Sequence, residues 1–344
     1  MNEFLAQNPV IPTEAPPTAK PLAGRRAWII SDGVAGHLAI TRGIAETLGL
    51  AAEVKPVDPR FPWRHLAPNG PADPSRLHAM LGEPLPELVL GAGRQTVPFV
   101  RALKRAGKGR VFTIIFQSPR AGASRAHLIW VPSHDRLRGP NVITTLTPPH
   151  RFTAAALGDL RARVPDVIAA LPRPRVALLL GGPGAGYVYD EATISRFAAI
   201  IGRVAVLAGS LLITPSRRTP PALLAAVDAA TEARPRLLWR GLGENPYPDF
   251  LANADLFIVP ADSVNMAGEA CATGKPVYVF TPPGGRGKFH RFHAALHAHG
   301  ATRPLDEAPR VLESWSYEPL ASAEQVAAEI EVRWQIFRST TSTP

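Results

Sequence analysis

Short apolar runs recur along this chain, and most of them are followed by a turn that contains glycine, serine or proline. After several of these turns the apolar residues are spaced three and four apart, as on one face of a helix. This alternation predicts an α/β protein with doubly wound parallel sheets, in which the strands are buried on both faces. The runs lie at residues 27–30, 88–90, 111–116, 128–132, 176–180, 210–213, 256–260 and 277–280.

The last two runs and the segment between them have the pattern of a β-α-β crossover. Asp262 or Ser263 is a suitable N-cap for the intervening helix. The free N–H groups of such a helix would point beyond the carboxyl end of the strand, where open α/β sheets bind ligands and where an anion such as a diphosphate is favoured. Glu269 would lie near the middle of this helix, either beside a ligand or as an ordinary surface carboxylate.

The α/β pattern occurs twice and predicts two similar domains that face a central cleft. We expect a flexible tail at residues 1–22, rich in Pro, Ala and Thr, and a first domain at residues 23–171. A proline-rich linker begins the second domain at residues 172–320. An amphipathic terminal helix falls within residues 321–344.

The net charge of +10 is concentrated in the first half of the chain. Residues 1–150 contain 18 Lys and Arg against 10 Asp and Glu, whereas the remainder contains 20 against 18. A basic face attracts anionic lipid headgroups, phosphorylated substrates or nucleic acid, although an arginine-rich solvated surface has the same composition. Nucleic acid is the less favoured partner, because aromatic residues make up only 7% and no zinc-finger or ribonucleoprotein motif is present.

The single cysteine, Cys271, excludes an internal disulfide and a cysteine-based structural zinc site. Apolar runs are far shorter than the roughly 20 residues of a membrane-spanning helix. We therefore expect a cytoplasmic protein, with a possible peripheral position at the inner membrane. No metal is expected: no Asp-x-Asp pair occurs, and the histidines at 290, 293, 297 and 299 are interpreted as solvated.

Three strand ends in the first half carry polar groups that could line the cleft. The turn at residues 32–37 offers Asp32 or His37 as a general base, with Gly33 and Gly36 leaving backbone N–H groups accessible; an exposed helix-start loop is the alternative. Gly93 and Arg94 follow the next strand, and Gln117 and Arg120 follow the one after. These four are predicted to line the acceptor side, or else to be a tight turn and a strand terminator.

In the second half, three strand ends are predicted to hold the diphosphate and ribose of a nucleotide. The glycine-rich turn would let a ligand approach the backbone closely, but it lacks the Gly-Lys-Ser/Thr of a P-loop. Arg217 and Arg218 suit phosphate recognition unless they belong to a solvated loop. Ser263 would contact phosphate, and Glu269 would accept hydrogen bonds from ribose. The glycines are Gly181, Gly182, Gly184 and Gly186.

Taken together, these motifs resemble those of the ELM mitochondrial-fission family, a domain of unknown function. The resemblance extends over residues 26–337 and rests on residues 31–37, 91–94, 214–219, 243–247 and 262–266. It implies a GT-B-like fold of two Rossmann-like domains, with the terminal helix crossing back to the first. It also implies that Asn265 and Met266 belong to the donor site.

A more distant similarity is to the peptidoglycan lipid N-acetylglucosaminyltransferase, whose Gly-x-Gly-Gly-His turn resembles residues 33–37 and whose ribose-binding glutamate corresponds to Glu269. The expected function is therefore metal-independent sugar transfer from a nucleotide-diphosphate sugar, with UDP the expected nucleotide, to an anionic or lipid-linked acceptor. No cofactor is expected. A non-catalytic nucleotide-sugar-binding or membrane-recruitment adapter and a nucleotide-sugar epimerase or hydrolase are the alternatives.

Overall fold

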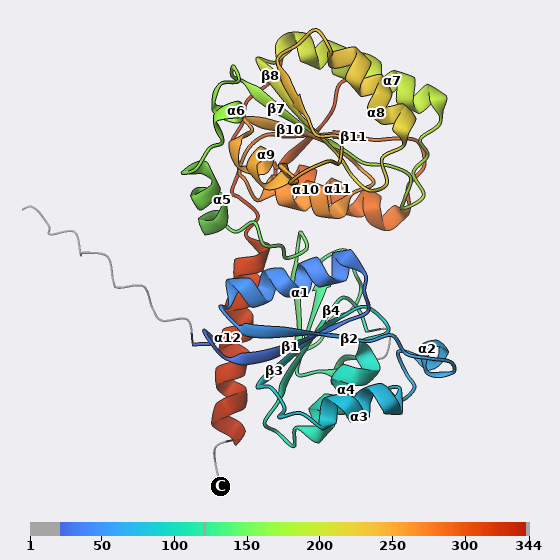
Figure 1. Ribbon diagram of the computed structural model, residues 1–344, viewed down its shortest axis with the longest axis vertical. Helices are drawn as coiled ribbons and strands as arrows, with labels where there is room; N and C mark the ends of the chain where they lie inside the picture. The colour runs from blue at the N-terminus through green and yellow to red at the C-terminus, as the bar shows by residue number, and fades with distance from the viewer. Residues whose placement is uncertain (1–20, 120–121, 342–344) are drawn as a thin grey trace, which may run out of the picture.

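The computed structural model describes residues 21–119 and 122–341, which form two α/β domains stacked end to end (Figure 1). The first domain contains a six-stranded, all-parallel sheet in the order β2-β1-β3-β4-β5-β6. Its strands are β1 (Arg26–Ser31), β2 (Ala51–Pro56), β3 (Leu88–Ala92), β4 (Phe112–Phe116), β5 (Leu128–Pro132) and β6 (Val142–Thr145).

The second domain repeats this architecture with the order β12-β11-β10-β7-β8-β9, again all parallel. The structure thus confirms the prediction of two Rossmann-like, doubly wound sheets. Its strands are β7 (Arg175–Leu180), β8 (Ser210–Pro215), β9 (Arg236–Leu238), β10 (Leu256–Pro260), β11 (Val277–Phe280) and β12 (Thr302–Pro304).

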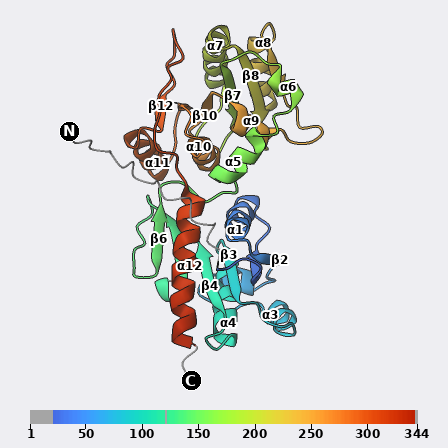
Figure 2. The same cartoon turned by 90° about the vertical axis from the view of Figure 1, so that its left-hand side faces the viewer.

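Helices cover both faces of each sheet (Figures 1 and 2). Those of the first domain are α1 (Ala35–Thr47), α2 (Trp63–Leu66), α3 (Pro74–Leu81), α4 (Val97–Ala106) and α12 (Ser322–Thr341), with the 3-10 helix η1 (Ala123–Arg125). Those of the second are α5 (Ala154–Arg161), α6 (Asp166–Ala169), α7 (Glu191–Leu207), α8 (Pro221–Thr231), α9 (Tyr247–Asn253), α10 (Val264–Cys271) and α11 (Gly287–Ala298).

The strand order of each sheet reverses at one point, and open α/β sheets bind ligands at such a point. In the first sheet the reversal lies between β1 and β3, so the turns after Ser31 and Ala92 meet there. In the second sheet it lies between β7 and β10, so the turns after Leu180 and Pro260 meet there. Four of the predicted site segments are therefore brought to two switch points.

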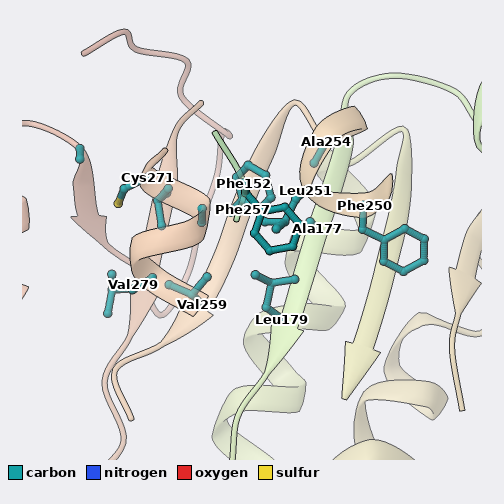
Figure 3. Packing of buried hydrophobic residues seen from close by; sticks show 14 of the residues in the cluster. Phe152, Ala177, Leu179, Phe250, Leu251, Ala254, Phe257, Val259, Cys271 and Val279 are labelled. Carbon is teal, nitrogen blue, oxygen red and sulfur yellow. The ribbon is translucent and has the colours of Figure 1, made fainter. Parts of the chain in front are cut away.

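The apolar core of the second domain includes the segment of chain that follows the last strand of the first domain. Phe152 is buried among Ala177, Leu179 and Phe257 on the face of the sheet that α5, α9 and α10 cover (Figure 3). Leu157 of α5 and Ile168 of α6 belong to the same cluster. Residues 154–169, which the sequence pattern assigns to the first domain, pack on the second, and Pro165 separates them into two helices.

The terminal helix α12 returns to the first domain, where it runs beside α1 and the edge of the sheet (Figure 2). Val326, Ile330 and Trp334 on its inner face join the apolar core of that domain, together with Leu22. Leu22, placed in the predicted tail, is thus a core residue, whereas residues 1–20 lie outside the described part. Among the described residues, no helix is long and apolar enough to span a bilayer.

The proline-rich stretch between β2 and β3 contains α2 and α3. Asp73 caps α3 by accepting a hydrogen bond from the Ser75 N–H, and Pro74 occupies the first helical position. Proline is favoured there because that N–H has no intrahelical partner. Pro74 therefore starts a helix in the structure.

The α12 packing predicts a sharp difference between two substitutions on one helix. Ile330→Ala should lower the free energy of unfolding by about 2–5 kcal/mol, because Ile330 is fully buried and its loss leaves a cavity. Val332→Ala, at a side chain that is 52% exposed, should change it by less than about 0.5 kcal/mol. Urea unfolding followed by fluorescence measures both; equal effects would contradict the placement of α12.

Candidate functional site

The carboxyl ends of the two sheets face each other across a cleft between the domains. The N-termini of α1 and α10 meet there, since a Cβ built on Gly36 would lie 3.7 Å from Nδ2 of Asn265. A cavity of about 390 Å³ beside this contact is lined by both domains. Its polar side chains include Gln117, Ser118, His134, Asp135, Asn265 and Lys288.

On the first-domain side, Asp32 and His37 form a hydrogen-bonded pair. Nδ1 of His37 lies 3.0 Å from both carboxylate oxygens of Asp32, whose side chain is only 8% exposed. A carboxylate accepts hydrogen bonds, so we assign the ring proton to Nδ1 and leave Nε2 as the basic nitrogen. A carboxylate that orients an imidazole in this way also stabilises the imidazolium formed when Nε2 takes a proton.

Gly93 makes room for this pair. Its φ is +89°, and a Cβ at this position would lie 2.4 Å from Oδ2 of Asp32 and from Nδ1 of His37. Glycine is required on both counts, because an L side chain is disfavoured at this φ and would collide with the pair. Gly33, with φ +77°, forms the turn that leads from β1 into α1.

The remaining residues predicted for the acceptor side lie apart from one another. Arg94 donates a hydrogen bond to the carbonyl of Arg64 in α2, so its guanidinium is directed at that helix. Gln117 lines the interdomain cavity and has a φ of +75°, a strained conformation for a residue with a side chain. Arg120 lies outside the described residues.

On the second-domain side, a buried carboxylate organises the switch point. Oδ2 of Asp262 accepts hydrogen bonds from the Gly182 N–H at 3.2 Å and from Nη2 of Arg218 at 2.9 Å, and Oδ1 accepts one from the Tyr189 hydroxyl at 2.5 Å. The Asp262 side chain is fully buried, and burial raises its pKa while these partners oppose the rise. Arg218 is therefore held by the protein itself.

The glycine-rich turn packs tightly against this ion pair. A Cβ on Gly182 would lie 1.8 Å from the Arg218 carbonyl oxygen, and one on Gly184 would lie 1.9 Å from Nη1 of Arg218. A Cβ on Gly181 would collide with Oδ1 of Asp262 at 2.3 Å. The small size of these glycines is thus required by contacts within the protein. Gly186, with φ +86°, faces Arg286.

Ser263 is the N-cap of α10, and its hydroxyl accepts a hydrogen bond from the Met266 N–H at 3.3 Å. The first turn of α10 separates two cavities. Val264 and Asn265 line the interdomain cavity, whereas Met266 and Glu269 line a cavity of about 770 Å³ within the second domain. Its volume is in the range of small-molecule sites, about 300–1,000 Å³.

Glu269 shares this second cavity with Tyr247 of α9. The Tyr247 hydroxyl donates a hydrogen bond to Oε2 of Glu269. Burial raises the pKa of Glu269 to about 7, although the hydrogen bond from Tyr247 and the charge of Arg151 act in the opposite direction. The carboxyl group of Glu269 therefore changes its protonation state near neutral pH. Arg217 is exposed at the rim of the same cavity.

The histidines of the 290–299 segment bond to backbone carbonyls. His290 contacts the carbonyl of Gly284, His293 that of Ala261, His297 that of Thr302, and His299 that of Glu318. Within residues 21–119 and 122–341, no three His, Cys, Asp or Glu side chains are grouped to hold a metal ion.

Three further residues that line the two cavities escaped the sequence reasoning: Trp239, Tyr247 and His134. Trp239 directly follows β9, and Tyr247 ends the Gly-Glu-Asn-Pro-Tyr motif at 243–247, so both carried a usable signal. His134 follows β5, and its Nδ1 is buried without a hydrogen-bond partner among the described residues. Lys288, the second residue of α11, lines the interdomain cavity from the second-domain side.

The two facing Rossmann-like domains and their shared cleft define a GT-B-like protein. The chain belongs to the family described as Mitochondrial fission ELM1, whose model matches residues 35–334. The mitochondrial fission protein ELM1 of Arabidopsis thaliana is 29% identical over 269 residues, which are 71% of this chain and 63% of that protein. Protein RP120 of Rickettsia prowazekii (strain Madrid E) is 30% identical over 194 residues, which are 55% and 53% of the two chains. The alignments thus cover less than two thirds of either relative.

Solved structures share the fold at low sequence identity. The UDP-GlcNAc 2-epimerase from Neisseria meningitidis, bound to UDP-GlcNAc, aligns with a TM-score of 0.52 and 12% identity over 92% of this chain and 93% of that one. MurG from Acinetobacter baumannii aligns with a TM-score of 0.47 and 13% identity, over 91% and 92% of the two chains. The epimerase comparison carries the fold assignment.

The raised pKa of Glu269 predicts a pH-dependent stability difference. Its pKa is about 7 in the folded protein against an ordinary value of 4.5, so the protonated carboxyl favours folding below pH 4.5 and this contribution is lost as the pH rises to 7. Relative to Glu269→Gln, the wild type should therefore lose up to about 3 kcal/mol of unfolding free energy between about pH 5 and pH 8.

Urea unfolding at several pH values measures this difference, and the exposed carboxylate of Glu232 provides the control variant Glu232→Gln. A constant gap between wild type and Glu269→Gln across the pH range would show that the Glu269 carboxyl is not held in a desolvated environment.

Proposed function

We propose that this protein is a GT-B-type glycosyltransferase that uses a nucleotide-diphosphate sugar. The observation that carries the proposal is the Asp32–His37 pair, which orients a basic Nε2 at the switch point of the first sheet. The N-terminus of α10 lies directly across the cleft from it. A general base and an anion-binding helix end on opposite walls are what metal-independent sugar transfer requires.

The donor would bind mainly to the second domain. The cavity of about 770 Å³ would take the nucleoside, with the Trp239 ring beside the base and the free oxygen of Glu269 accepting a ribose hydroxyl. The diphosphate would lie at the N-terminus of α10, close to Arg217. The Neisseria relative in fold, which is bound to UDP-GlcNAc, supports a UDP-sugar as the donor.

In the proposed reaction, Nε2 of His37 accepts the proton of an acceptor hydroxyl as its oxygen attacks the anomeric carbon of the sugar. The bond between that carbon and the diphosphate oxygen breaks, and both its electrons leave with the nucleotide. The N-terminus of α10, Arg217 and Lys288 stabilise the negative charge on the leaving group, and Asp32 stabilises the imidazolium. These groups would supply the charge stabilisation without a cofactor. An anionic acceptor in the interdomain cavity would face Lys288.

A second candidate is a non-catalytic nucleotide-sugar-binding adapter. It is favoured by the Asp262–Arg218 ion pair, which fills the glycine-rich turn expected to receive the diphosphate. Sugar epimerisation or hydrolysis on the same site would need the donor but no acceptor. The three functions therefore differ in what happens to a bound donor.

The proposal predicts that UDP raises the melting temperature and that a panel of UDP-, GDP- and CMP-sugars includes one donor for transfer or slow hydrolysis. His37→Asn should keep the UDP-induced thermal shift and lower turnover by about 10²–10⁴-fold, because only the general base is removed. His297→Asn, at an exposed histidine on α11, is the matched control and should leave turnover unchanged.

Each alternative gives a distinct result. UDP binding without turnover of any donor in the presence of candidate acceptors would support the adapter. A sugar of altered configuration, or free UDP formed at the full rate without an acceptor, would support the epimerase or hydrolase. If no nucleotide or nucleotide sugar shifts the melting temperature, the nucleotide site itself is refuted.

A further inference from the structure

The end of the first domain opposite the cleft is rich in positively charged residues. Residues 101–110 contain five Lys or Arg and no acidic residue. They lie in the last six residues of α4 or in the turn that precedes β4, and therefore near the amino end of that strand. The cleft lies at the carboxyl ends, and the two surfaces are thus at opposite ends of the domain.

We call the following residues the basal surface: Lys104 and Arg105 at the end of α4, Lys108 and Arg110 in the turn before β4, and Val332 and Ile336 of α12. Figures 1 and 2 both show α4 and the last turns of α12 at the same end of the molecule. His127 links the two halves of the patch. Its ring centroid lies 4.8 Å from that of Phe337, and burial and then the charge of Lys104 lower its pKa to about 4.

The four cations of the basal surface have no acidic partner in the described part of the chain: none forms an ion pair with a carboxylate within residues 21–119 and 122–341. Arg105, Lys108 and Arg110 are exposed. Neighbouring Arg101 has a lowered pKa, first through burial and then through the charges of Arg125 and Arg105. Like charges held together in this way attract an anionic partner.

The same surface exposes aliphatic side chains on the outer face of α12. Val332 is 52% and Ile336 is 58% exposed, whereas Ile330 and Trp334 on the inner face are buried. A hollow of about 450 Å³ lies between this outer face and Phe112 of β4. Arg333 lines the hollow and is paired with Glu329. Apolar groups in water beside unpaired cations are typical of a surface that contacts lipid at the headgroup level.

We propose that the basal surface docks on an anionic membrane surface, with the cations at the phosphate groups and Val332 and Ile336 at the acyl boundary. Exposed aliphatic side chains within the basal surface favour lipid over nucleic acid, for which stacking aromatic residues are expected. Docking here would direct the cleft away from the bilayer, so an acceptor would reach it from solution. The proposal is independent of sugar transfer, because no residue of the basal surface lines the cleft.

The test is co-sedimentation of the full chain with phosphatidylcholine vesicles that contain or lack phosphatidylglycerol. The wild type should bind only the anionic vesicles, and binding should weaken as salt screens the charges. The triple variant Arg105→Gln, Lys108→Gln and Arg110→Gln should bind about a hundredfold more weakly. Val332→Ser combined with Ile336→Ser should weaken binding without changing the charge.

A matched control removes three exposed arginines of the second domain, Arg163→Gln, Arg234→Gln and Arg310→Gln, and should bind as the wild type does. Melting temperatures establish that every variant is folded. Failure of the wild type to bind anionic vesicles, or equal weakening by the two triple variants, would overturn the proposal. Tighter binding to duplex DNA than to the vesicles, lost in the basal triple variant, would assign the surface to nucleic acid instead. The response to UDP is measured separately, so either proposal can fail alone.

Discussion

The chain crosses between the two domains twice, and the contact between these two connecting segments determines where the site lies. Oγ1 of Thr147 on the first segment and Oγ of Ser322 on the second are 2.6 Å apart, and both residues are buried. Gly268 of α10 packs directly on Thr147, since a Cβ there would lie 3.1 Å from its Cβ. The α10 helix therefore packs directly against a segment that connects the two domains. This contact holds the N-terminus of α10 beside that of α1, so the two helix N-termini meet in the cleft.

Much of this arrangement follows from local sequence signals. Apolar runs identify the strands, and because the carboxyl ends of parallel strands share one edge, polar turns after them must converge. That rule predicted His37 and Asp32 on one wall and Ser263 on the other. The same pattern did not reveal that Asp32 orients His37, because the pairing depends on how the turn folds and on the space that Gly93 leaves.

Contacts between distant segments could not be predicted in this way. Arg218 and Asp262 are 44 residues apart, and nothing in the arginine pair indicates that Arg218 is held by a buried carboxylate while Arg217 lines the second-domain cavity. Glu269 and Tyr247 likewise meet only once α9 and α10 are packed. Burial of such groups changes their charge and pKa, so their chemistry is a property of the tertiary structure.

The central claim is that the N-terminus of α10 and the neighbouring cavity form a nucleoside-diphosphate site. A crystal structure of the protein with UDP tests it most directly. We predict the diphosphate at the backbone N–H groups that follow Ser263, a ribose hydroxyl on Glu269 and the base beside Trp239. UDP bound elsewhere, or a diphosphate held by the glycine-rich turn with the Asp262–Arg218 pair broken, would contradict it.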